Sequence, residues 1–248
     1  LAGSSAASDV YKRQALTSSD SLYWLGWAFA ILVIVFPLWL GRNASTELRR
    51  TFEKSWALLL LLSYIAMTGL SMYRGEASWA TSLLAHMCGF SRLLAIAYLF
   101  KASRWMGVLV TFTGIAGGVQ SLLTPEFTNG LHPVNVFDYY FNHASIVGIG
   151  IYIIMIHKER LQKFSWLKAF GQIQILALIA VGINLLTGGN YMYLMEPPIA
   201  DNPLIIRSES FPYMHVVFFE VFAALNFLII QLVLSRIKID KPVEVDVA

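Results

Sequence analysis

Charged residues are scarce in this chain of 248 residues, since Asp, Glu, Lys and Arg together make up only 13% of it. Soluble domains carry roughly 25% charged residues, so this proportion excludes an ordinary soluble globular enzyme. The chain has a single cysteine, Cys88, which excludes a small secreted domain cross-linked by disulfides. The net charge of +3 is spread over several segments, which excludes a nucleic-acid-binding protein.

Hydrophobic residues make up 57% of the sequence, and the mean hydropathy is +0.61. A bilayer core of about 30 Å is crossed by roughly 20 apolar residues in a helix. Apolar runs without period-two alternation favour helices over a membrane β-barrel. The sequence therefore predicts an all-α, polytopic membrane protein built as a seven-transmembrane-helix bundle. The predicted spans are residues 22–40, 56–73, 79–100, 106–123, 137–156, 170–186 and 213–234.

The two ends of the chain are expected to lie outside this bundle. Residues 1–14 do not begin with methionine and look like a translated adapter, so we interpret them as non-native. The predicted organisation is an N-terminal tail (1–20), a seven-helix transmembrane domain (21–235) and a charged cytoplasmic tail (236–248).

Basic residues alternate strongly between the connections of the predicted spans. Thirteen of the 18 Lys and Arg residues fall after the first, third, fifth and seventh spans, whereas the alternate loops hold only Arg74 and Arg207. Cytoplasmic loops carry an excess of Lys and Arg. The pattern predicts an N-terminus outside and a C-terminus in the cytoplasm.

Polar side chains within the predicted spans concentrate at their extracytoplasmic ends. Such residues are costly in a membrane and often mark functional sites. We therefore predict an outward-facing polar cavity that includes Cys88 and His143, with the alternative that Asn190, Tyr191 and Tyr213 are interfacial anchors. The supporting cavity residues are predicted to be His86, Arg92, Gln120, Thr124, Asn184, Asn190, Tyr191 and Glu220.

Arg92 is too deep in its predicted span to reach the interface easily, so it needs a carboxylate or carbonyl partner. Glu220 is also well inside its span, and we expect these two residues to pair. Cys88 and Arg92 are four residues apart and share one helix face. The glycines near Gly114 and Gly118 are expected to allow close helix packing.

Several separated motifs, in the correct order, resemble one membrane-protein family. They are His86-Met87-Cys88, Gly114-x-x-Gly117-x-x-Gln120-Ser121-Leu122-Leu123-Thr124-Pro125, Phe141-Asn142-His143 and Asn190-Tyr191-Met192-Tyr193-Leu194. Over residues 24–234 the chain resembles the bacterial YwaF-like integral membrane family, which is similar to the animal transmembrane protein 164 group. The resemblance favours the plasma membrane of a bacterium.

The resemblance to the animal group implies acyl transfer on lipid within the membrane, with Cys88 as the nucleophile and His143 as the base. The expected substrate is a membrane lipid or acyl-lipid, handled by an acyltransferase or an acyl hydrolase without a cofactor. Arg92 would stabilise negative charge near the sulfur, and the candidate donors to an oxyanion are Gln120, Thr124 and Asn184.

Two other functions fit the residues. The first is a zinc-dependent seven-span lipid hydrolase, although no His-x-x-x-His or Cys-x-x-Cys spacing is present. Its candidate ligands are His86, Cys88, His143, His215 and Glu220. The second is a transporter or receptor that binds a small ligand in the outer cavity and needs no nucleophile.

Overall fold

The computed structural model describes residues 15–127, 130–198 and 210–237. The segment interpreted as non-native (1–14) and most of the predicted cytoplasmic tail therefore lie outside the described residues. The described part is all-helical, as predicted, and contains seven α-helices and one 3-10 turn. They are α2 (Ser21–Asn43), α3 (Thr46–Tyr73), α4 (Met87–Phe100), α5 (Arg104–Leu123), α6 (Pro133–Met155), α7 (Ser165–Thr187), η1 (Tyr191–Tyr193) and α8 (Met214–Leu234).

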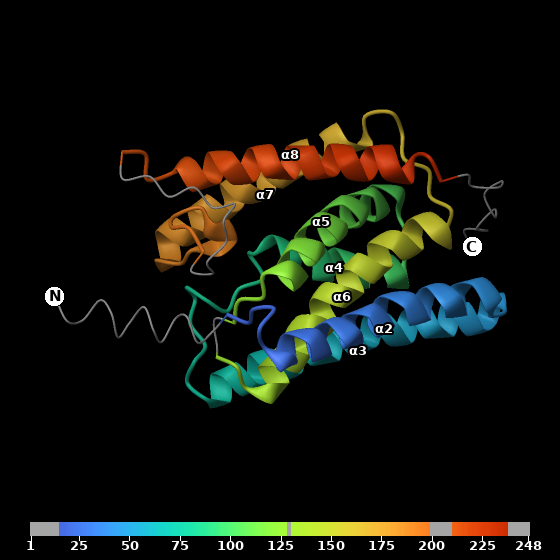
Figure 1. The fold of residues 1–248 in the computed structure, drawn as a ribbon, viewed down its shortest axis with the longest axis horizontal. Coiled ribbons are helices and arrows are strands. Elements are labelled where there is room, and N and C mark those ends of the chain that lie inside the picture. The colour runs from blue at the N-terminus through green and yellow to red at the C-terminus, as the bar shows by residue number, and fades with distance from the viewer. Residues whose placement is uncertain (1–14, 128–129, 199–209, 238–248) are drawn as a thin grey trace.

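The centre of the bundle is formed by α5 and α6, which pack extensively on each other (Figure 1). On one side, α2 packs against α6, and α3 packs against α4 and α6. On the other side, α7 and α8 pack together and against α5. Trp56, Tyr152 and Phe227 belong to the buried core between these layers. The short α4 completes the bundle beside α5 and brings Cys88 into its interior.

Two glycines allow the close contact between α5 and α6. A Cβ on Gly114 would lie 2.5 Å from the carbonyl oxygen of Ile146, and one on Gly118 would lie 2.9 Å from that of His143. Real Cβ atoms do not approach a backbone oxygen this closely, so these positions require glycine. The pair has the small-x-x-x-small spacing that the sequence associates with helix packing. This contact sets the α6 segment that carries His143 directly against α5.

The prediction of one long helix over residues 79–100 is wrong in its first part. Helix α4 begins at Met87, and residues 79–86 are irregular. Hydroxyl groups satisfy the backbone there: Ser78 N–H donates to Ser82 Oγ, and the Tyr191 hydroxyl accepts from Leu83 N–H and donates to the Trp79 carbonyl. Such local bonds compete with helix formation. Cys88 therefore lies in the first turn of a short helix.

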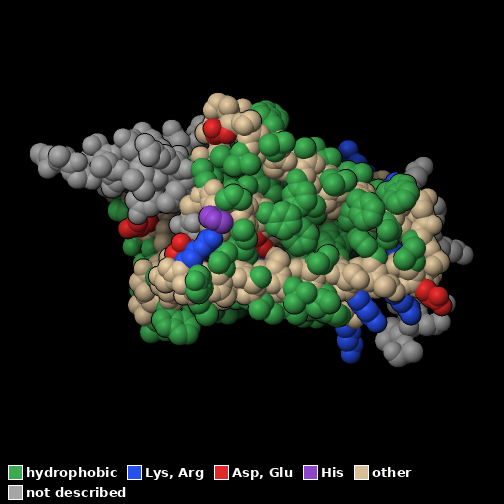
Figure 2. Space-filling model, turned by 90° about the horizontal axis from the view of Figure 1, so that it is seen from below, with side chains coloured by type: hydrophobic (Ala, Val, Ile, Leu, Met, Phe, Trp, Pro, Cys, Tyr) green, Lys and Arg blue, Asp and Glu red, His purple; other side chains and the backbone are tan. Residues whose placement is uncertain are grey.

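Five of the helices, α2, α3, α5, α7 and α8, are long and apolar enough to cross a membrane. Helix α4 has only 14 residues, and α6 carries Asp138, Asn142 and His143 among its apolar residues. Figure 2 shows a broad hydrophobic face on which most of the visible Lys and Arg side chains lie toward the right-hand end, while another lies beside a His toward the left-hand end. Leu178 and Leu186 are 73% and 89% exposed, which suits contact with lipid better than contact with water.

Candidate functional site

Two cavities meet at Cys88. One, which we call the apolar chamber, has a volume of about 250 Å³, and the other, the polar chamber, has a volume of about 340 Å³. Ligand pockets commonly measure about 300–1,000 Å³, so each is close to the lower end of that range. The residues that line both chambers are His86, Cys88, Ser121, Glu126, Tyr139 and Tyr193.

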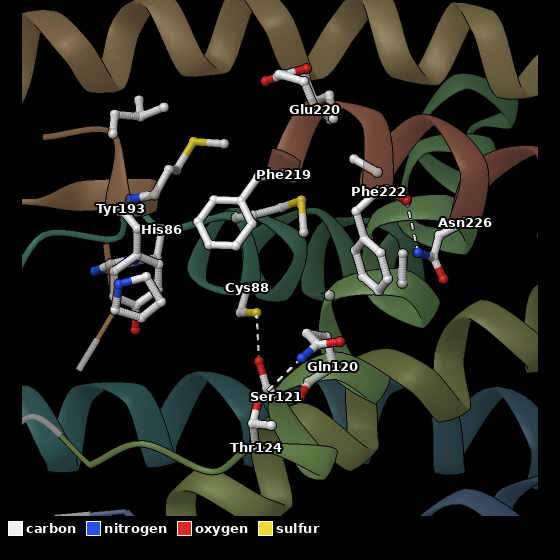
Figure 3. Close-up of a pocket in the computed structure, with 18 of the residues that line it drawn as sticks. His86, Cys88, Gln120, Ser121, Thr124, Tyr193, Phe219, Glu220, Phe222 and Asn226 are labelled. Atoms are coloured by element: carbon white, nitrogen blue, oxygen red, sulfur yellow. Dashed lines mark hydrogen bonds between the residues drawn. The ribbon is translucent and has the colours of Figure 1, made fainter. Parts of the chain in front are cut away.

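Cys88 is the second residue of α4, and its Sγ lies 3.5 Å from Ser121 Oγ on α5 (Figure 3). His86 is the N-cap residue of α4, and its side chain makes no hydrogen bond to the first turn of the helix. A helix N-terminus carries partial positive charge and stabilises an anion placed there. A thiolate, the reactive form of cysteine, would be stabilised by this position once a base has removed the thiol proton.

The apolar chamber extends from Cys88 between α5 and α8. Its wall includes Ile173 of α7 and three aromatic rings of α8, Phe219, Phe222 and Phe227. Gly117 of α5 faces this space: a Cβ there would lie 3.5 Å from Cys88 Sγ and 2.6 Å from Met87 Cε. The absence of a side chain at Gly117 keeps open the space beside the sulfur.

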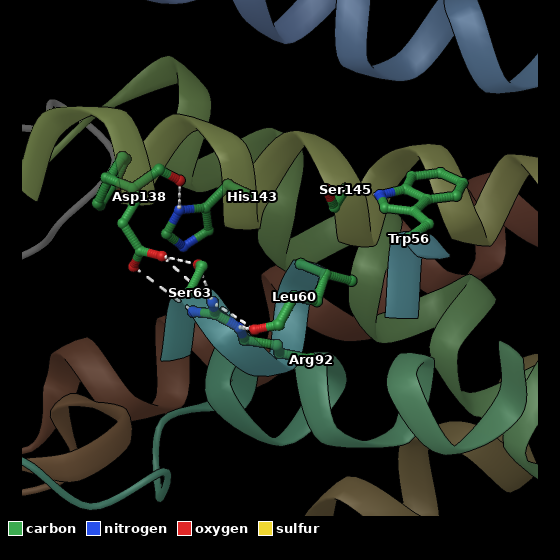
Figure 4. A network of polar contacts seen from close by, with 8 residues as sticks. Trp56, Leu60, Ser63, Arg92, Asp138, His143 and Ser145 are labelled. Carbon is green, nitrogen blue, oxygen red and sulfur yellow. Dashed lines mark hydrogen bonds and ion pairs between the residues drawn. The ribbon is translucent and has the colours of Figure 1, made fainter. Parts of the chain in front are cut away.

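The polar chamber extends from Cys88 in the other direction, between α3, α4 and α6. Arg92, only 4% exposed, donates from Nε and Nη2 to the carbonyl oxygen of Leu60 at 3.2 and 2.8 Å. Its Nη2 lies 3.2 Å from Asp138 Oδ1, and Ser63 bonds to both side chains (Figure 4). The predicted pairing of Arg92 with Glu220 is therefore wrong. Glu220 instead accepts from Gln174 Nε2 at 2.7 Å, and the carboxylate near Arg92 comes from α6.

His143 lines the polar chamber with a defined tautomer. Its Nδ1 lies 2.7 Å from the carbonyl oxygen of Tyr139, which can only accept a hydrogen bond. Nδ1 therefore carries the proton, and the neutral imidazole has its lone pair on Nε2. The Tyr139 ring packs on the imidazole with 4.2 Å between centroids, and the Tyr139 hydroxyl donates to the Ser121 carbonyl. Tyr139 thus contacts both His143 and the backbone of Ser121, whose hydroxyl lies beside Cys88 Sγ, whereas Cys88 and His143 form no hydrogen bond with each other in the described part of the chain.

The structure brings five of the predicted supporting residues to the chambers. Gln120, Thr124 and Glu220 line the apolar chamber, Arg92 lines the polar one, and His86 lines both.

The other three predicted residues shape the loop after α7. Asn184 bonds to the backbone N–H and C=O of Tyr191, and Asn190 Oδ1 accepts from the N–H groups of Met195 and Glu196. Tyr191 fixes the segment before α4 with its hydroxyl.

Sequence reasoning missed Ser121 and Tyr139, which line both chambers. Helical spacing could have found them: Tyr139 precedes His143 by four residues, and Ser121 follows Gly117 by four. It also missed Asp138 as the partner of Arg92. An apolar segment offers no spacing rule for a contact between two helices far apart in the sequence.

The candidate zinc ligands do not form a cluster. Within the described ranges, no group of three or more His, Cys, Asp or Glu side chains is placed to hold a metal ion. The ring nitrogens of His215 lie 3.0 Å from the carbonyl oxygens of Pro212 and Tyr193, and Glu220 bonds to Gln174. The side chains of His215 and Glu220 therefore make hydrogen bonds within the protein instead of binding a metal ion.

A comparison with known families gives one result. The family model described as the TMEM164 family matches residues 15–231, which is most of the chain. No curated protein and no solved structure matches.

Proposed function

This chain belongs to the TMEM164 family and is a helical, multi-pass membrane protein, and on that premise we propose that it transfers acyl groups of membrane lipids through a thioester on Cys88. The observation that carries the proposal is the position of Cys88, which lines both an apolar and a polar chamber. An acyl ester has the same division, with an apolar chain on one side of its carbonyl and a polar group on the other. A lipid whose chain occupies the apolar chamber would place its carbonyl beside Sγ.

The proposed reaction has two halves. His143 Nε2 takes the thiol proton, Sγ attacks the ester carbonyl carbon, and a C–S bond forms as the C=O electron pair moves to oxygen. The tetrahedral intermediate collapses, the C–O bond breaks, and the leaving alkoxide takes the proton from His143. A hydroxyl compound or water then gives a proton to His143 and attacks the thioester. The C–S bond breaks, and the released Cys88 thiolate takes the proton back from His143, which restores the thiol and the neutral imidazole.

The polar chamber suits the acceptor of the second half-reaction. Asn142 and Ser71 line it, each is 8% exposed, and neither Asn142 Oδ1 nor Ser71 Oγ has a hydrogen-bond partner within the described part of the chain. A buried polar atom without a partner costs about 1–3 kcal/mol. A ligand hydroxyl that reached these atoms would give them partners, and on that ground we assign the acceptor to this chamber.

We propose the same seven-span arrangement as the sequence predicts, with the N-terminus outside and the C-terminus in the cytoplasm of a bacterial cell. At 1.5 Å per residue, the 14 residues of α4 cover only about 21 Å. The irregular residues 79–86 would complete this crossing. Irregular backbone is tolerated at membrane depth where it lines a cavity, and Thr81, Ser82, Leu83 and Leu84 line the polar chamber.

The test is acylation of the sole cysteine by the p-nitrophenyl ester of octanoic acid, followed by release of p-nitrophenolate and by the mass of the intact protein. We expect one octanoyl adduct on the wild type and none on Cys88→Ala. Replacement of His143 by Gln should slow acylation by on the order of 10²-fold or more, as loss of a general base does. His132→Gln is the matched control, because His132 is exposed and lines neither chamber. An unacylated wild type would overturn the proposal.

A further inference from the structure

His86 lines both of the chambers that meet at Cys88, and its imidazole has a defined tautomer. Its Nδ1 lies 3.2 Å from the backbone N–H of Met192, which can only donate. Nδ1 is therefore the acceptor, and the neutral imidazole carries its proton on Nε2. His143 has the opposite tautomer, because its Nδ1 donates to the Tyr139 carbonyl. Two histidines at one site thus offer one donor and one acceptor.

The imidazole of His86 is held in place from several directions. Its ring packs edge-on against Tyr191, with 5.2 Å between centroids, and is tilted against the Tyr193 ring, with 5.5 Å between centroids. The backbone that supplies the Met192 N–H is unusual, since Met192 and Tyr193 have φ values of 57° and 53°. Residues with a Cβ adopt this left-handed conformation at a cost, and such strain clusters at functional sites. The strained turn fixes both the position and the tautomer of His86.

The other candidate donors already make hydrogen bonds within the protein: Thr124 uses its only donor, and Gln120 and Asn184 each use one of two amide N–H groups. Gln120 Nε2 donates to Thr124 Oγ1, and Thr124 Oγ1 donates to the Gln120 carbonyl, each at 3.1 Å. Asn184 Nδ2 donates to the Tyr191 carbonyl at 3.0 Å. His86, by contrast, lines both chambers and precedes Cys88 by two residues.

We propose that His86 is a catalytic residue whose Nε2–H donates to the oxyanion formed when Cys88 attacks an acyl carbonyl. This inference rests on the proposed acyl transfer. As the C–S bond forms, the C=O electron pair moves to oxygen, and the Nε2–H bond to that oxygen strengthens. When the pair returns and the C–O bond of the ester breaks, the bond weakens again. His86 keeps its proton throughout, while His143 accepts and returns the transferred proton.

The experiment compares two reactions of the same sulfur. Acylation by octanoyl p-nitrophenyl ester passes through an oxyanion, whereas alkylation by iodoacetamide is a displacement at carbon that forms none. Because Cys88 is the sole cysteine, the intact mass reports both. His86→Ala should slow acylation by about 10²–10³-fold, the usual cost of removing an oxyanion donor, and should leave alkylation within about twofold of the wild type. His86→Gln retains an N–H donor and should recover part of the acylation rate.

The outcomes separate this inference from the proposed function. If the wild type is acylated and both His86 variants match it, or if acylation and alkylation fall together, His86 has no role as an oxyanion donor. If the wild type is not acylated, the proposed function fails and the role of His86 fails with it. His132→Ala is the control for loss of a histidine outside the chambers.

Discussion

Arg92 of α4 and Asp138 of α6 form an ion pair with 3.2 Å between Nη2 and Oδ1, and Ser63 of α3 bonds to both. The Arg92 side chain is 5% exposed and that of Asp138 is 18% exposed. One polar contact thus joins three helices at the wall of the polar chamber.

We expect either single replacement, Arg92→Met or Asp138→Val, to destabilise the protein by about 3–5 kcal/mol, because a charge would be left buried without its partner. The double variant should recover a large part of that loss. Thermal unfolding of the four proteins in detergent measures the coupling. Glu220→Gln combined with Arg92→Met is the control pair and should be additive. Additivity for Arg92 and Asp138 would show that they are not partners.

Gly117 provides a test of the apolar chamber. A side chain there would fill the space beside Cys88 Sγ and displace only the flexible end of Met87. Gly117→Val should therefore reduce acylation by long-chain p-nitrophenyl esters more than by the acetyl ester, with a further cost of about 1–3 kcal/mol in stability from overpacking. Gly171→Val is the matched control, since a Cβ at Gly171 meets nothing within 4 Å. An equal reduction in the acylation rate for esters of all chain lengths would show that the acyl chain does not bind in the apolar chamber.

Replacement of Asn142 should slow the release of the acyl group without lowering the stability of the protein. Its Oδ1 is buried without a partner among the described residues, so Asn142→Leu should leave the melting temperature unchanged or raise it. The same variant should still be acylated on Cys88 but should release the acyl group to glycerol more slowly. Intact mass over time measures both steps. A strong loss of stability with normal release would mean that Asn142 serves the fold alone.

The bias of basic residues predicts the orientation of the chain. On a Cys88→Ala background, a cysteine at the exposed Glu76 should react with an impermeant maleimide from outside the cell. A cysteine at the exposed Lys163 should react only after the membrane is permeabilised. Reversed reactivity would overturn the proposed orientation.

The sequence predicts the helices well because hydrophobic length largely determines them in a membrane protein. It fails over residues 79–86, where contacts with Tyr191, far away in the sequence, replace helical hydrogen bonds. The same limit explains why Asp138 was not identified as the partner of Arg92. Depth along a helix can be estimated from residue number, but the direction in which a side chain points depends on how the helices pack.

The chambers themselves could not be predicted either. Cys88 and His143 are candidates from residue type and resemblance, but the tautomers of His86 and His143 follow from single backbone groups, the Met192 N–H and the Tyr139 carbonyl. Such contacts depend on the loop after α7 and on the register of α6 against α5. They become visible only when the fold is known.

The central claim is that Cys88 accepts an acyl group from a lipid, and the most direct measurement is the intact mass of the protein in nanodiscs of a diacyl phospholipid with deuterated chains. After acid quenching, we expect wild-type protein to carry one deuterated acyl group, His143→Gln to acquire it on the order of 10²-fold more slowly, and Cys88→Ala to carry none. An unmodified wild-type protein, with a thiol that iodoacetamide alkylates no faster than a model thiol, would contradict the account and favour a ligand-binding protein.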